Sequence, residues 1–192
     1  HNGLVRMATE RGAPCNINTN GLGLTPEVAV ALVESGLSRV HLSLDSPHAY
    51  VQDAIHQKPG RWAQVLCGLY NLQVAKTILG AEHPVIHINC VLTRLNAEDF
   101  PDFLRFLLEM KPLVEDGISP DLDLHVIPVG GEQNRALRLT AEGYRRFFTD
   151  VWRTADEVWQ EYQAARSVPE DKRGALHEKI PFLSPYHRVS HR

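Results

Sequence analysis

The feature that most constrains the fold is a regular alternation of short β-branched segments with longer amphipathic segments. Short segments rich in β-branched residues are typical of strands, and apolar residues at 3.6-residue spacing are typical of helices. A strand followed by a helix and another strand predicts right-handed crossovers and a parallel sheet. The expected strands are 15–19, 39–45, 85–92 and 122–129, and the expected helices are 2–11, 26–34, 61–79, 97–110 and 140–166.

Local signals place most of the helix boundaries. Thr25 precedes a proline and a glutamate, which is the pattern of an N-cap with an acidic first turn. Gly36 and Gly80 are expected to end their helices, whereas Asn96 and Thr140 are expected to cap the two that follow. Residues 46–60 are rich in proline and polar side chains and are predicted to form a loop.

Four parallel strands are too few for a closed barrel, and an uncovered edge beside residues 15–19 is unfavourable. The prediction is therefore an α/β fold that is an incomplete parallel (β/α) TIM-like barrel, with strands missing upstream. The barrel unit is expected over residues 1–149. Residues 150–192 are expected to be a helical and irregular C-terminal extension.

Composition restricts the classes of partner. The 192 residues carry a formal net charge of -3 with both signs intermixed, so a basic face for nucleic acid is not expected. No apolar run approaches the roughly 20 residues of a membrane span, so no membrane partner is predicted and a cytoplasmic location is expected. Three widely spaced cysteines indicate reduced thiols. The oligomeric state stays open.

Polar tripeptides stand where three of the expected strands end, the place where α/β barrels position functional groups. Polar residues also occur there as turns and helix caps, so the pattern alone leaves both interpretations open. These groups are Thr19-Asn20-Gly21, Ser43-Leu44-Asp45-Ser46 and Thr93-Arg94-Leu95-Asn96.

The order of these motifs resembles the radical S-adenosylmethionine superfamily. The resemblance rests on the string NTNGLGLTPEVAVALVESGLSRVHLSLDSP, the GRW that starts the next helix, and INCVLTRLNAEDFPDFLRFL, and it spans residues 16–129. It is closest to the branch that holds the molybdenum-cofactor cyclase and the peptide-modifying and sulfatase-maturing enzymes. The four strands resemble strands three to six of that family's (β/α)6 partial barrel.

The resemblance implies an enzyme that cleaves S-adenosylmethionine reductively at a 4Fe-4S cluster, yielding a 5'-deoxyadenosyl radical that abstracts hydrogen from a peptide or small molecule. In the family, a CxxxCxxC loop after the first strand holds the cluster. That segment is not among these residues, and none of Cys15, Cys67 and Cys90 is assigned to the cluster. The parent protein is thus expected to use both cofactors, and the isolated chain is expected to be inactive.

The family's site residues carry over at matching positions. Ser43 resembles the serine that hydrogen-bonds the amino-acid end of the methionine moiety, with Asp45 as its structural or ligand-facing companion. Ile127 resembles the residue that meets adenine, and Asn20 is assigned to the cofactor as well. On local grounds alone, Ser43 and Asp45 would instead cap the turn before Pro47.

Substrate contacts are assigned to three further positions. Thr19 resembles a residue that faces substrate, and Thr93 stands where some relatives have a basic residue. Arg94 carries the charge next to it and can bind a carboxylate. The local alternative pairs Arg94 with Glu98, four residues later.

Other classes of function fit less well. A cluster-free binding module for a peptide or partner protein is the main alternative, and an aldolase or phosphate-binding barrel lacks a Schiff-base lysine and a glycine-rich loop. The Gly130-Gly131-Glu132 sequence is interpreted as a turn, and the histidine spacing predicts no metal site within the chain.

Overall fold

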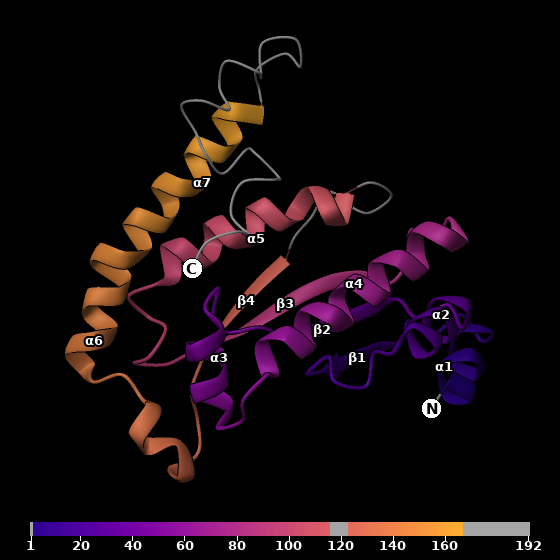
Figure 1. Ribbon diagram of the computed structural model, residues 1–192, viewed down its shortest axis with the longest axis horizontal. Helices are drawn as coiled ribbons and strands as arrows, with labels where there is room; N and C mark the ends of the chain where they lie inside the picture. The colour runs from indigo at the N-terminus through magenta and orange to yellow at the C-terminus, as the bar shows by residue number, and fades with distance from the viewer. Residues whose placement is uncertain (1, 116–122, 167–192) are drawn as a thin grey trace.

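The computed structural model describes residues 2–115 and 123–166 and contains one four-stranded parallel sheet (Figure 1). Its strands follow the chain in spatial order β1-β2-β3-β4, so each strand pairs with its neighbour in sequence. The strands are β1 (Asn16–Thr19), β2 (Arg39–Ser43), β3 (Val85–Leu92) and β4 (Asp123–Pro128).

Helical connections join the strands, which confirms the predicted α/β fold class of an incomplete parallel barrel. Among these connecting helices α2 packs against α4, and α5 packs against α7, which follows the last strand. The helices are α1 (Asn2–Thr9), α2 (Pro26–Glu34), α3 (Ala49–His56), α4 (Arg61–Leu79), α5 (Phe100–Glu115), α6 (Ala141–Arg146) and α7 (Trp152–Arg166), with a 3-10 turn η1 (Glu132–Leu137) and a π-helical turn η2 (Phe147–Val151). No helix in these ranges is long and apolar enough to cross a membrane.

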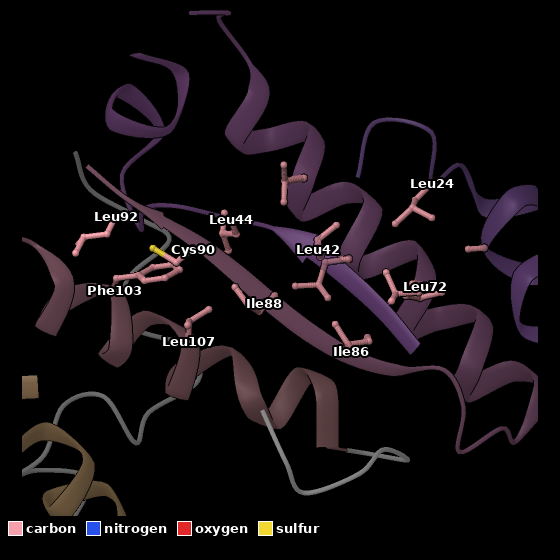
Figure 2. Close-up of a cluster of buried hydrophobic side chains, with 14 of the residues drawn as sticks. Leu24, Leu42, Leu44, Leu72, Ile86, Ile88, Cys90, Leu92, Phe103 and Leu107 are labelled. Atoms are coloured by element: carbon pink, nitrogen blue, oxygen red, sulfur yellow. The ribbon is translucent and has the colours of Figure 1, made fainter. Parts of the chain in front are cut away.

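The strands alternate between an apolar face and a polar face. On β3, Ile86, Ile88, Cys90 and Leu92 are at most 4% exposed and pack with Leu42 of β2 and with residues of α4 and α5 (Figure 2). Burial of each such aliphatic side chain stabilises the fold by about 2 kcal/mol. The intervening residues of β3 point to the opposite face, called the inner face below, and none of them belongs to the described core.

The structure corrects the prediction of a loop over residues 46–60. Residues Ala49–His56 form α3, and Asp53 joins this helix to the start of α4. The sequence signal was weak because the N-cap residue His48 makes no side-chain capping bond. Gln57 ends the helix at φ 52°, a left-handed conformation that is usually taken by glycine.

Two other helix predictions were wrong in part. The α5 helix begins at Phe100 rather than Ala97, and the Asn96 side chain binds Thr93 instead of capping it. The Thr140 hydroxyl does cap a helix, by accepting from the Gly143 amide at 3.0 Å. That helix is not continuous, however, because η2 separates α6 from α7.

The expected boundary after residue 149 falls inside η2. Residues on both sides of it, Phe147, Val151 and Ala155, belong to the same buried cluster as the strands. The irregular part of the expected extension, 167–192, lies outside the described residues.

Candidate functional site

The candidate site is the inner face of the sheet near the C-terminal ends of β2, β3 and β4. Residues paired in a parallel register present their side chains to the same face. Ser43 is in register with Asn89, and Val91 is in register with Ile127. Ile127 is 46% exposed, so this face is accessible at its β4 side.

A second row lies one step nearer the N-terminal ends of the strands. His41 on β2 is in register with His87 on β3, and their ring centroids are 4.8 Å apart. Side chains of successive rows stack as layers inside such barrels. The two histidines therefore form a floor beneath the Ser43–Asn89 row.

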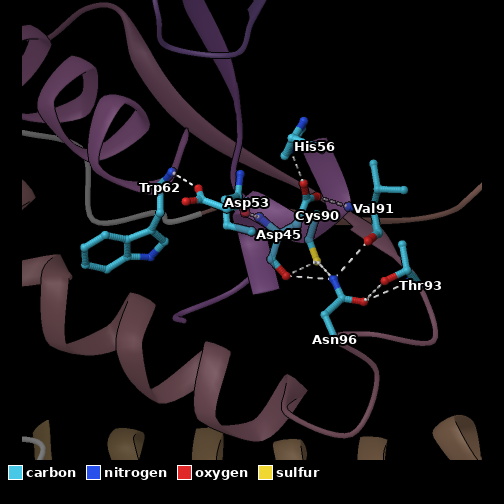
Figure 3. Close-up of polar contacts among 9 residues, drawn as sticks. Asp45, Asp53, His56, Trp62, Cys90, Val91, Thr93 and Asn96 are labelled. Carbon is cyan, nitrogen blue, oxygen red and sulfur yellow. Dashed lines mark hydrogen bonds and ion pairs between the residues drawn. The ribbon is translucent and has the colours of Figure 1, made fainter. Parts of the chain in front are cut away.

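Where β2 leaves the sheet, the Asp45 side chain takes the place of the β2 backbone as a hydrogen-bond acceptor for β3. The Leu44 amide still donates to the Asn89 carbonyl at 3.0 Å, but the next β3 amide, that of Val91, donates to Asp45 Oδ1 at 2.6 Å (Figure 3). The other carboxylate oxygen bonds His56 Nε2 at 2.8 Å. Asp45 is only 1% exposed, so this carboxylate holds β2 and β3 together from within.

Asn96 ties the same two strand ends together from the loop that follows β3. Its Nδ2 donates to the carbonyls of Asp45 at 2.7 Å and Val91 at 3.0 Å (Figure 3). Its Oδ1 accepts from the amide and the hydroxyl of Thr93 at 2.7 and 2.9 Å. One carboxamide thereby satisfies four polar groups, three of them buried and the Val91 carbonyl partly buried, that would otherwise lose a partner.

Two residues of the α3 helix connect the end of β2 to the start of α4. Gln52, which is fully buried, accepts from the Asp45 amide at 2.7 Å. Asp53 accepts from the amides of Gly60 at 2.6 Å and Trp62 at 3.1 Å, which anchors α3 to α4. The hydrogen bond from the Trp62 amide lowers the pKa of Asp53. Residues 46–60 were predicted to form a loop, so the contacts of Gln52 and Asp53 were not expected.

The cysteines do not form a ligand set for an iron-sulfur cluster. Cys15 precedes β1, Cys67 is exposed on α4, and Cys90 is buried on β3. Burial raises the pKa of the Cys90 thiol, and the negative charge of Asp45 raises it further. Across residues 2–115 and 123–166, no group of three His, Cys, Asp or Glu side chains is placed to hold a metal ion.

The predicted cofactor residues take different positions. Ser43 is half-buried on the inner face, and within the described part of the chain its hydroxyl has no hydrogen-bond partner. Asp45 is buried two residues beyond Ser43, past the C-terminal end of β2, where its carboxylate bonds Val91 and His56. Asn20 is exposed just beyond β1, where its Oδ1 accepts from the Leu22 amide at 3.2 Å.

The three residues predicted to meet substrate are not gathered at one point. Thr19 shares the face of its register partner Leu42, which is the core face, and its hydroxyl accepts from the Gly21 amide at 3.1 Å. Thr93 is fully buried against Asn96, so a direct contact with a ligand would require that pair to open. Arg94 is exposed.

Two local alternatives are wrong. The Arg94 guanidinium donates through Nε to the Ala136 carbonyl at 2.5 Å, and Glu98 instead pairs with Arg146 at 3.1 Å. The turn after β2 is closed by Ser46, whose hydroxyl accepts from the His48 amide at 3.0 Å, and not by Ser43 or Asp45.

The parallel strand-helix units, with polar groups at the strand ends, place this chain in the class of β/α-barrel folds, in which ligands bind at that edge. Within that class, this chain belongs to the Radical SAM superfamily, whose family model matches residues 2–107. This confirms the family that the sequence motifs indicated.

Three relatives show which proteins it is similar to. It is 34% identical over 102 residues to an AdoMet-dependent heme synthase of Nitratidesulfovibrio vulgaris, covering 53% of this chain and 26% of that protein. It is 34% identical over 100 residues to a mycofactocin maturase of Mycolicibacterium smegmatis, covering 52% and 24%. A tungsten-containing aldehyde ferredoxin oxidoreductase cofactor-modifying protein of Pyrococcus furiosus is 28% identical over 136 residues, covering 68% and 35%. The matches thus span about a quarter to a third of each relative.

Proposed function

We propose that the natural protein containing this chain is a radical S-adenosylmethionine enzyme that abstracts hydrogen from a peptide or small-molecule substrate. The observation that carries the proposal is the superfamily match over residues 2–107 combined with the Ser43 hydroxyl on the inner face, which has no hydrogen-bond partner among the described residues. A 4Fe-4S cluster would supply the electron that cleaves S-adenosylmethionine. Because Cys15, Cys67 and Cys90 do not converge, its ligands would lie outside these residues.

In this proposal the described residues act by binding and positioning. The Ser43 hydroxyl donates to the carboxylate of the methionine moiety, a charge-assisted hydrogen bond that is stronger than a neutral one. Ile127 packs against adenine from the exposed end of β4, and Asn20 borders the same ligand from β1. Asp45 keeps Ser43 in place through its bonds to Val91 and His56.

Substrate would approach the same edge of the sheet. Arg94 is the exposed cation nearest in sequence to the β3 end, so it would bind a carboxylate of the substrate after releasing the Ala136 carbonyl. Thr93 would act only indirectly, through its bond to Asn96, and Thr19 would make no direct contact because its side chain is on the core face. The proposal also includes a cytoplasmic location for the natural protein and a substrate that is either a peptide or a small molecule.

The test uses the natural protein in which these residues occur, purified anaerobically. The measurements are the dissociation constant for S-adenosylmethionine and the formation of 5'-deoxyadenosine and methionine after reduction with dithionite. We expect Ser43→Ala to weaken binding about 10-fold or more, the loss of one hydrogen bond to a charged group.

The matched control is Ser38→Ala, because that serine lies at the opposite end of β2, where its Oγ accepts from the Cys15 amide at 3.1 Å. It should leave affinity for S-adenosylmethionine unchanged. A wild-type protein that binds no S-adenosylmethionine and forms no 5'-deoxyadenosine would refute the enzyme proposal. That outcome would favour a cluster-free binding module.

A further inference from the structure

The segment between β4 and α6 is attached to the end of β3 at two closely spaced points. At its start the Val129 amide donates to the Leu92 carbonyl at 3.2 Å, and at its end the Leu137 carbonyl accepts from the Arg94 amide at 2.9 Å. Residues 130–138, called the strap below, form the short coil between β4 and α6 in Figure 1. A surface loop of this length whose ends lie close together is an Ω-loop, a kind of segment that is frequently functional.

The strap holds its own shape through bonds between its residues. Asn134 Nδ2 donates to the Gly130 carbonyl at 2.8 Å, and Arg138 Nη2 donates to the Gly131 carbonyl at 2.7 Å. Glu132 adds an ion pair with Arg138, at 3.9 Å. None of the residues of η1, which makes up most of the strap, is buried. Packing against the core therefore contributes little to keeping the strap in place.

The Arg94 side chain reinforces the attachment at the end of the strap. Its Nε donates to the Ala136 carbonyl at 2.5 Å, next to the bond that the Arg94 amide makes to Leu137. A hydrogen bond from a charged donor is stronger than one between neutral groups. Beyond these two bonds and the one from Val129, no printed hydrogen bond or ion pair joins the strap to the other residues among 2–115 and 123–166. Arg94 therefore controls whether the strap stays attached.

Two glycines at the start of the strap provide a hinge. Gly131 has φ 82° and ψ 141°, a conformation that residues with a Cβ rarely adopt. A Cβ on the preceding Gly130 would meet nothing within 4 Å, so there is open space beside the backbone. Successive glycines in open space can absorb the change in φ and ψ that a hinge motion needs.

We propose that residues 130–138 form a hinged strap that Arg94 latches at the C-terminal edge of the sheet, and that the strap opens as a unit while the sheet stays folded. In the closed state the Arg94 guanidinium is bound to the Ala136 carbonyl. In the open state it is free at the edge where β/α barrels bind their ligands. The carboxylate contact proposed above for Arg94 requires this open state, but the strap itself does not depend on the proposed function.

The Arg94 amide reports the opening, because its acceptor, the Leu137 carbonyl, belongs to the strap. The reference is the Val91 amide, which donates to Asp45 Oδ1 at 2.6 Å and makes no bond to the strap. Hydrogen-deuterium exchange of the natural protein, resolved to single amides by fragmentation in the mass spectrometer, measures both. We express each rate as a protection factor, which removes the effect of the side chain on intrinsic exchange.

The first measurement is made on wild type at increasing urea concentrations below the unfolding transition. A local opening exposes little surface, so its free energy changes little with urea. We therefore expect the protection of the Arg94 amide to be lower than that of Val91 and nearly independent of urea. The protection of Val91 should fall as urea increases.

The second measurement compares Arg94→Gln with wild type. Loss of the guanidinium removes the bond to Ala136 and leaves the backbone amide of residue 94 in place. We expect the protection of that amide to fall about 5-fold, while the protection of Val91 stays unchanged. The matched control is Arg105→Gln, which removes an arginine that pairs with Asp102 on α5 at 2.8 Å, and it should change neither amide.

Two results would overturn the strap proposal. One is equal urea dependence of the Arg94 and Val91 amides, which would mean that the strap opens only together with the sheet. The other is an Arg94→Gln variant in which the amide of residue 94 keeps its protection, or in which both amides lose protection equally. A natural protein that binds no S-adenosylmethionine would instead refute the proposed function, and the exchange results would still decide the strap proposal.

Discussion

At the residue scale, Asn96 is the side chain on which the geometry of the candidate site depends most. It is 3% exposed and bonds groups on both β2 and β3. Substitution Asn96→Ala leaves the Thr93 amide and the carbonyls of Asp45 and Val91 without their partner. We expect it to lower the free energy of unfolding by about 2 to 4 kcal/mol, measured by urea denaturation.

The control for Asn96 is Asn134, whose Nδ2 makes one hydrogen bond, to the Gly130 carbonyl, in an exposed turn. Asn134→Ala is expected to cost less than about 1 kcal/mol. Equal effects of the two substitutions would show that the bridge between β2 and β3 contributes no more than an ordinary turn.

Also at the residue scale, the buried Lys76 side chain should make the free energy of unfolding rise with pH. Its side chain is 1% exposed, its Nζ donates to the Pro84 carbonyl at 2.7 Å, and burial lowers its pKa to about 8. Between pH 8 and the unfolded pKa of about 10.5, the unfolded chain binds more protons, so stability increases with pH. The increase amounts to at most about 3 kcal/mol.

Lys76→Met lacks this titrating group. Denaturation of both proteins at several pH values from 7 to 10.5 should therefore show wild type gaining stability relative to the variant across that range. A constant difference would mean that Lys76 titrates with an ordinary pKa. The comparison removes the contributions of other groups that titrate in the same range.

At the element scale, we expect opposite effects on stability when two helical glycines, Gly68 and Gly3, are replaced by alanine. A Cβ on Gly68 of α4 would lie 2.5 Å from the Gly21 carbonyl oxygen, a backbone atom that cannot rotate away. A Cβ on Gly3 of α1 would meet nothing within 4 Å. We expect Gly68→Ala to destabilise by about 1 to 3 kcal/mol and Gly3→Ala to be neutral or to stabilise by up to about 1 kcal/mol.

Thermal unfolding of the two variants against wild type measures this contrast. A stabilising Gly68→Ala would mean that α4 can move away from the turn after β1. Such a result would contradict the close approach of α4 to that turn, which excludes any side chain at position 68.

Elements with strong local signals were predicted from the sequence, and those fixed by tertiary contacts were not. Thr25 and Gly80 mark the ends of α2 and α4 because a capping hydroxyl and a left-handed glycine act locally. The α3 helix lacks both signals and is fixed by Asp53 and by buried Gln52. The π-helical turn η2 likewise has no side-chain capping bond and no glycine from which its position could be predicted.

At the scale of the whole molecule, topology was predictable, whereas the site was predictable only in part. Strand order follows from alternation, but the bond between Asn96 and Asp45 spans 51 residues, so no local pattern reports it. The position of Asn89 on the inner face was not predicted because it depends on register. The alternation of polar His87 and Asn89 with buried Ile88 and Cys90 was the signal that could have found it.

The alkylation rates of two cysteines, Cys67 and Cys90, measure whether the core of the fold stays closed. Cys67 is exposed on α4, whereas Cys90 is fully buried at the centre of the core and its pKa is raised. Cys67 is accessible to the reagent and should alkylate directly in the folded protein, whereas Cys90, whose thiolate is disfavoured by burial, should react only through molecules that have opened.

Mass spectrometry after timed iodoacetamide labelling measures both rates in one sample. The Cys90 rate should rise with urea in parallel with global unfolding, because Cys90 lies in the core cluster formed by the sheet and its helices, with the Asp45 carbonyl beside its thiol. If Cys90 reacted as fast as Cys67 without denaturant, the β2 and β3 ends would be open in the native chain. The Asp45 and Asn96 bridges that position Ser43 would then not persist in solution.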